Sequence, residues 1–81
     1  MVIQCNIAPT YNFTGNGNWT DAANWTGNMI PPPYLDHGKI IINPVDGGSC
    51  ILNTSMQLGA GGSLQVLPGK KFVVNGSFIQ Q

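Results

Sequence analysis

Short runs of alternating apolar and polar residues, each followed by a turn that contains glycine, occupy the chain from Gly38 onward. Such runs predict β-strands of about five residues, because successive side chains point to opposite faces of a strand. The first run holds three consecutive isoleucines and predicts a buried strand. The predicted strands cover residues 39–43, 49–53, 64–66, 72–74 and 78–79.

Glycine and proline mark the turns between these strands. The cluster of Gly59, Gly61 and Gly62 predicts a turn, because glycine adopts backbone conformations that other residues avoid. The other predicted turns lie at residues 45–48, 68–69 and 75–76.

The first part of the chain has a different pattern. Residues 2–7 predict a short strand, and residues 10–28 predict an ordered loop rich in Asn and Gly that contains both tryptophans. Within this loop, residues 21–25 predict one helical turn, with Thr20 or Asp21 as its cap. The three consecutive prolines at 31–33 cannot join a central strand and predict an extended polyproline II segment.

Two arrangements of the strands are compatible with this pattern. Ile42 and Leu64 are 22 residues apart in the sequence, and so are Leu52 and Val74. A constant offset between inward-pointing residues favours a short parallel β-helix, a solenoid in which each coil stacks on the one before. The Asp-Gly and Asn-Gly dipeptides are also typical hairpin turns, so a small antiparallel β-sandwich is the alternative.

A chain of 81 residues is long enough for one domain only. We expect an all-β domain over residues 1–81, with an N-terminal strand and capping loop at 1–37 and short-strand β-coils at 38–81. Trp19 and Trp25 would cap the open end of the coils, since an uncapped end exposes apolar side chains and unpaired strand edges.

Charge is nearly absent from this sequence. Lys and Arg total 3, Asp and Glu total 3, and the net charge is 0. Nucleic acid and anionic membrane surfaces are therefore not expected as partners, because both are bound by clustered basic residues. No apolar run approaches the roughly 20 residues of a membrane span.

The uncharged surface, rich in Asn, Thr and Gly, favours an extracellular or cell-surface location. Met1–Ile7 lack the basic and apolar regions of a signal peptide, so we expect the signal to lie outside this sequence.

Few residues are candidates for disulfide formation, metal binding or catalysis. Cys5 and Cys50 can form one disulfide, worth about 4 kcal/mol in the loop-closure model, and two buried thiols are the alternative.

These cysteines and the single histidine, His37, do not supply the four ligands of a zinc site. The three aspartates fall in loops without a glutamate, which is unlike the paired carboxylates of a glycosidase. We expect no catalytic residue, no metal site, no cofactor and no enzymatic activity.

One segment resembles a known class of protein. The run Gly-Asn-Trp-Thr-Asp-Ala-Ala-Asn-Trp at 17–25 is followed by Gly27 and the prolines, and then by Asp36 and the isoleucine strand. This order is similar to the start of β-helical repeat regions in secreted bacterial surface proteins, of the Bacteroidetes extracellular and autotransporter-like kinds. The G8-type domain of cell-surface proteins has a similar order of features. The resemblance implies a capping segment of a surface adhesin, a structural protein or an accessory part of a polysaccharide-degrading enzyme, and brings no catalytic residues.

Aromatic and asparagine side chains are the candidate ligand contacts. Sugars lay their C–H faces on exposed aromatic rings, while amides fix their hydroxyl groups. The alternative is that the tryptophans are buried as a cap. The candidate residues are Trp19, Trp25, Tyr11, Tyr34, Asn18 and Asn24.

We therefore expect a non-catalytic structural or adhesive segment of a secreted or cell-surface protein. The alternative is a small carbohydrate-binding module that uses the aromatic residues of the loop at 10–34, with a polysaccharide as partner. Self-association is also expected, through exposed β edges or through the C-terminal strand with Phe78 and Ile79, because few charges guard those edges.

Overall fold

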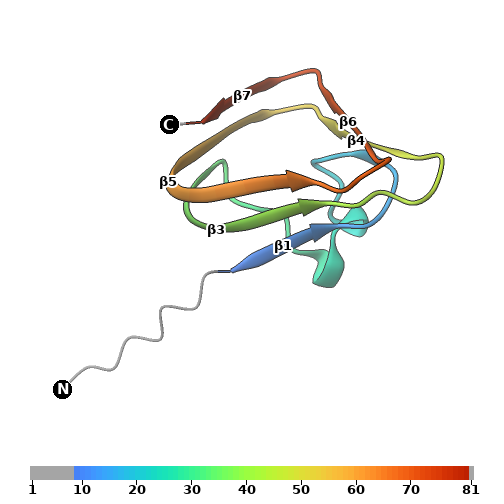
Figure 1. Cartoon of the computed structure of the whole chain (residues 1–81), viewed down its shortest axis with the longest axis horizontal. Coiled ribbons are helices and arrows are strands. Elements are labelled where there is room, and N and C mark those ends of the chain that lie inside the picture. The colour runs from blue at the N-terminus through green and yellow to red at the C-terminus, as the bar shows by residue number, and fades with distance from the viewer. Residues whose placement is uncertain (1–8, 81) are drawn as a thin grey trace.

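The computed structural model describes residues 9–80, and within this range the chain is built mostly of strands (Figure 1). Two single-turn 3-10 helices, η1 (Ala22–Asn24) and η2 (Thr26–Asn28), are the exceptions. Neither is long enough to cross a membrane. The strands are β1 (Thr10–Phe13), β2 (Gly17–Asn18), β3 (Tyr34–Ile42), β4 (Ser49–Leu52), β5 (Ser55–Val66), β6 (Lys71–Val74) and β7 (Ser77–Gln80).

The strands form two sheets, and every ladder between named strands is parallel. One sheet has the order β1-β3-β5-β7 and the other has the order β2-β4-β6. The chain thus alternates between the sheets, and each strand lies beside the strand two positions earlier. An antiparallel sandwich, the alternative expected from the Asp-Gly and Asn-Gly turns, is therefore wrong. The parallel pairing fits the β-helix-like arrangement favoured by the sequence.

The pairing register confirms one of the two predicted 22-residue offsets. Leu52 pairs with Val74, as the spacing predicts. Ile42 pairs with Val66 and not with Leu64. The offset between β3 and β5 is already 23 residues at Tyr34 and Leu35, and a β-bulge raises it to 24 from His37 onward, because β5 takes three steps from Leu58 to Gly61 where β3 takes two.

The glycine cluster does not form a turn, so this prediction is wrong. Gly59, Gly61 and Gly62 lie inside β5, where the backbone passes very close to β3. A Cβ atom at Gly61 would lie 2.5 Å from the carbonyl oxygen of Asp36, and one at Gly62 would press against the carbonyl oxygen of Leu35. Glycine is required here for close approach of two strands and not for a reversal of the chain.

The core lies between the two sheets. The inward residues of β4 are Cys50 and Leu52, as their alternation predicts, and both are fully buried. Aromatic rings fill the end of the core nearest β1 and β2. The buried hydrophobic residues are Phe13, Trp19, Trp25, Leu35, Ile40, Ile42, Cys50, Leu52, Met56 and Leu58.

The remaining sequence predictions are mostly confirmed downstream of residue 38 and partly wrong upstream of it. The helical turn exists as η1, and Asp21 caps it by accepting a 3.1 Å hydrogen bond from the Ala23 backbone N–H. The prolines at 31–33 stay outside the strands. The segment expected to be a loop contains β1 and β2, which the pattern did not predict. The strand predicted at 2–7 lies outside the described residues.

Candidate functional site

The two tryptophans meet at the first layer of strands. Trp19 follows β2, Trp25 follows η1, and their rings pack edge to face with centroids 4.9 Å apart. Trp25 also packs edge to face on Phe13. The indole Nε1 of Trp25 donates a 2.8 Å hydrogen bond to the main-chain carbonyl of Trp19. The polar atom of this ring is therefore satisfied inside the protein, as burial requires.

Neither indole has a face exposed for sugar stacking. Trp19 is 1% exposed and Trp25 is 2% exposed. The predicted stacking of a sugar on these two rings is therefore wrong, because neighbouring aromatic rings occupy their faces. Their burial supports the alternative role, in which they close one end of the core.

Asn24 supplies hydrogen bonds to the outer edge of the first layer. Its backbone carbonyl accepts from the N–H groups of Thr14 and Gly15, at 2.9 and 3.1 Å. Its side-chain Oδ1 accepts from Asn16 N at 3.2 Å, and its Nδ2 donates to Asn18 O at 3.0 Å. The backbone and side chain of Asn24 thus make hydrogen bonds with main-chain groups of residues 14–18, as a neighbouring strand would do. The predicted role of Asn24 in ligand binding is wrong, because the residue is buried and both polar atoms of its side chain are hydrogen-bonded within the protein.

The opposite end of the molecule has no equivalent cover within residues 9–80. β6 and β7 are the last strands of their sheets. Leu52 is fully buried, whereas Val74, its register partner one layer further on, is 47% exposed. Phe78, the partner of buried Met56, is only partly buried. Side chains at inward-pointing positions are therefore less buried in the last layer than in the layer before it.

The other candidate residues are not brought together. Tyr11 is half-buried against the core, and Asn18 is an exposed residue of β2. Tyr34 is 48% exposed at the start of β3. The six candidates therefore do not form one site, and Tyr34 alone presents an accessible aromatic ring.

Tyr34 belongs to an outward-facing row that crosses three layers. It pairs in register with Gln57, which pairs in turn with Ile79. Beside this row, Ser55 pairs with Ser77, and the Ser77 hydroxyl donates to the Ser55 hydroxyl at 3.2 Å. No local motif marks Gln57 or the two serines, although Ser55 and Ser77, like Gln57 and Ile79, are 22 residues apart in the sequence.

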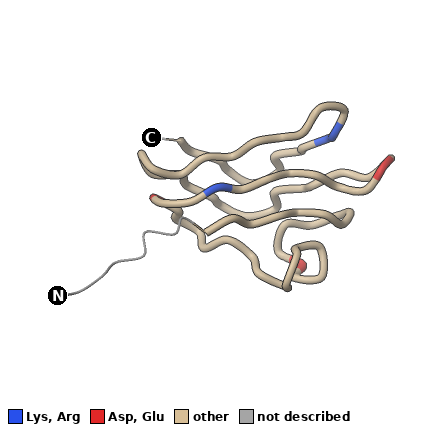
Figure 2. Tube along the Cα trace, turned by 60° about the horizontal axis from the view of Figure 1, so that its bottom comes forward, with Lys and Arg blue, Asp and Glu red and all other residues tan. Residues whose placement is uncertain are grey.

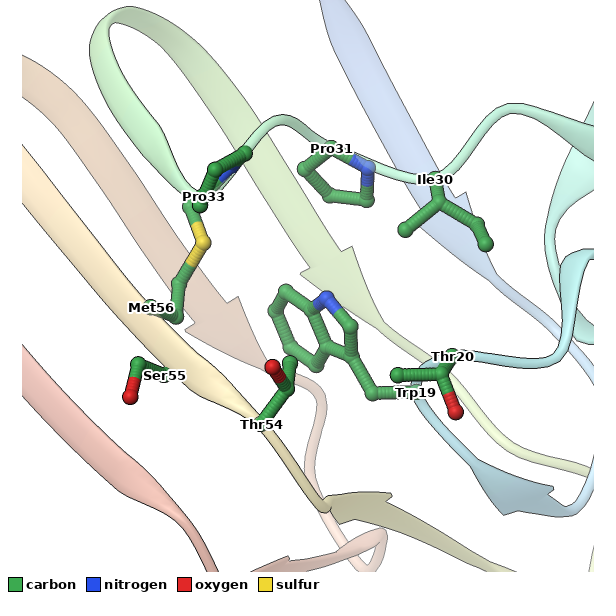
Figure 3. Close-up of a pocket in the computed structure, with 8 residues that line it drawn as sticks. All are labelled: Trp19, Thr20, Ile30, Pro31, Pro33, Thr54, Ser55 and Met56. Atoms are coloured by element: carbon green, nitrogen blue, oxygen red, sulfur yellow. The ribbon is translucent and has the colours of Figure 1, made fainter.

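A hollow of about 350 Å³ lies at this row. A second hollow of about 240 Å³ shares its residues Pro33, Ser55 and Met56. Figure 3 shows the second hollow, where the Trp19 indole lies between Pro31 and Thr54 and the Met56 side chain reaches toward Pro33. The first hollow is lined by Pro33, Tyr34, Ser55, Met56, Gln57, Ser77 and Ile79.

Charged residues are scattered over the trace (Figure 2), and none of them is among the residues that line either hollow. Lys70 and Asp46 form an exposed ion pair of 2.8 Å between turns. The hydrogen bond from Lys70, followed by its positive charge, lowers the pKa of Asp46. This pair ties two turns together and faces no cavity.

The buried thiol of Cys50 is the one strongly perturbed titratable group in the part of the chain described. Burial raises its pKa to about 12, which keeps it protonated and unreactive at neutral pH. Cys5 lies outside the described residues, so the disulfide stays a prediction. Residues 9–80 contain no group of three His, Cys, Asp or Glu side chains placed to hold a metal ion.

The chain matches no protein-family model, no curated protein and no solved structure.

Proposed function

We propose that this chain is a non-catalytic structural segment, the capped end and first layers of a short parallel β-helix. The difference between its two ends carries the proposal. Asn24 and Trp25 cover the first layer, whereas Val74 is left half-exposed in the last layer at a position equivalent to buried Leu52. A stack of strands with one closed end and one open end is suited to carry further layers.

The proposal places the protein outside the cell or on the cell surface. The support is the uncharged surface, with only six charged side chains in the chain, and the resemblance of residues 17–32 to the start of β-helical regions in secreted bacterial proteins. In that setting the segment holds an extended β structure in place, and its role is adhesion or support.

In the isolated chain, we propose that a second copy occupies the open end. The edges of β6 and β7 carry backbone groups that can pair with another strand, and Phe72, Val74 and Phe78 gain cover from it. The net charge of 0 gives no repulsion between copies.

Sedimentation velocity across a concentration series tests this proposal, together with amide hydrogen exchange. We expect a larger species at high concentration, and new protection confined to the amides of β6 and β7. A monomer at every concentration, or protection that grows at β1 and η1 instead, would contradict it.

A further inference from the structure

The hollow beside Tyr34 differs from the rest of the surface in combining an accessible aromatic ring with uncharged polar groups. No residue that lines it is charged. The lining joins Pro33, Met56 and Ile79 with two serine hydroxyls and the Gln57 amide. Ligand sites commonly pair an apolar lining with a few placed polar groups, and the volume of about 350 Å³ lies within their usual range.

The ring of Tyr34 is held against the sheet. A Cβ atom at Gly59 would lie 2.6 Å from the Tyr34 hydroxyl oxygen, so the absence of a side chain at Gly59 lets the phenol approach the β5 backbone. The residue is nonetheless 48% exposed. Tyrosine in this position presents an apolar surface and a polar tip to the same ligand.

The polar groups repeat along the stack of layers. Ser55 and Ser77 are register partners, and so are Tyr34 and Gln57. Neighbouring strands lie about 4.8 Å apart, which is close to the length of one sugar unit in an extended polysaccharide. The Ser77 hydroxyl donates to Ser55, which leaves the Ser55 hydroxyl hydrogen free for another acceptor.

We propose that this hollow binds a neutral, extended polysaccharide that runs across β3, β5 and β7. The C–H face of one sugar stacks on Tyr34 and Pro33, and sugar hydroxyl groups bond to Gln57 and the two serines. No charged residue lines the hollow, which favours a neutral polymer, and Asp36, beside the Tyr34 hydroxyl, disfavours an acidic one. Tyr34 belongs to β3, two strands away from the β7 edge on which the proposed second copy pairs, so the effect of Tyr34→Ala on binding can be measured separately from association.

Affinity electrophoresis in native gels that contain xylan, mannan or β-glucan tests the site, with alginate as the acidic polymer. We expect at least one neutral polymer to retard the protein. Tyr34→Ala should weaken retardation by about tenfold, and Tyr34→Phe should retain most of it because the ring remains. Val45→Ala, an exposed apolar change outside both hollows, is the matched control and should bind normally.

Gln57→Ala gives a second test that does not alter the ring, and it should also weaken retardation. The thermal unfolding midpoints of all variants are measured first, so that binding is compared among folded proteins. Retardation by none of the neutral polymers overturns the proposal. So does retardation that Tyr34→Ala and Gln57→Ala leave unchanged, or retardation by alginate alone.

Discussion

The Nε1 atom of Trp25 lies 2.8 Å from the main-chain oxygen of Trp19, and the two rings meet edge to face. This contact joins the segment after η1 to the segment after β2. It also lets an indole be almost fully buried without an unpaired N–H group. The first layer of strands is closed by this one residue on its apolar side and by Asn24 on its polar side.

Replacement of Trp25 by alanine should destabilise the protein by about 3–5 kcal/mol, the usual loss when a buried aromatic site is emptied. A domain of this size has little stability in reserve, so we expect most of the variant to be unfolded. Urea unfolding followed by circular dichroism measures the change. Val45→Ala, which alters an exposed side chain, should shift stability by no more than about 0.5 kcal/mol. Equal midpoints for Trp25→Ala and the native protein would show that the ring is not part of the core.

Asn24 provides a sharper test of the capped end, because its side chain both accepts and donates. Asn24→Asp keeps an acceptor for Asn16 N but loses the donor to Asn18 O, and it buries a charge. We expect a loss of about 1–3 kcal/mol, the cost of leaving a buried polar group unpaired. Asn75→Asp, at an exposed turn, is the control and should have little effect. Stability lost equally by the two variants would indicate a general effect of charge.

The later strands could be predicted because their side chains alternate between a covered and an open face. Cys50 and Leu52 show this pattern clearly, and the structure confirms it. β1 and β2 were not predicted in this way. Thr10–Phe13 alternates between polar and aromatic residues, but for four residues only and beside a segment rich in Asn and Gly, and the two residues of Gly17–Asn18 are too few to show a pattern. Their strand conformation comes from pairing with β3 and β4, which is a tertiary effect.

The candidate site was harder to predict than the fold. Tyr34 could be identified as an aromatic candidate, but the sequence does not tell an exposed ring from a buried one, and Trp19 and Trp25 proved buried. The row that joins Tyr34 to Gln57 depends on a 23-residue offset between β3 and β5, which no local pattern predicts. The glycine cluster is ambiguous for a related reason, because glycine marks both turns and close approaches of strands.

Gly62→Ala should therefore destabilise the protein although it adds only one methyl group. The new Cβ would collide with the backbone carbonyl of Leu35, and neither strand can move without disturbing its ladder. We expect a loss of about 1–3 kcal/mol, the range for overpacked sites. Ala60→Ser adds an atom to an exposed residue of the same strand and serves as the control. Thermal unfolding of the two variants is compared, and equal midpoints would mean that the strands are not closely packed there.

In the reduced protein, Cys50 should resist alkylation at pH 8 until the chain unfolds. Its pKa of about 12 keeps the thiol protonated, and its side chain is fully buried. The unfolded thiol ionises near pH 9, so stability should fall as the pH rises from about 9 toward 12, where only the unfolded state has released the proton. Cys50→Ala removes the ionisable thiol and is the control for the pH series. Rapid alkylation of the folded protein would contradict the buried environment.

The same alkylation assay decides the predicted disulfide. Protein from an oxidising compartment, unfolded without reductant, should take up no label at Cys5 or Cys50 if they are bonded. Two labelled thiols would show that the pair is not bonded, and burial of Cys50 would then be its only structural role.

Val74→Lys should abolish association through the open end while leaving the fold intact. Val74 points inward in the last layer yet is 47% exposed, so a lysine there can extend to solvent in the monomer. A second copy placed on β6 would bury the lysine charge without a partner, which is strongly unfavourable. We expect the variant to sediment as a monomer at concentrations where the native protein forms a larger species. Val45→Lys adds the same charge at an exposed turn and should associate like the native protein. If both lysine variants became monomeric, repulsion between like net charges would explain the result, and the open end would have no special role.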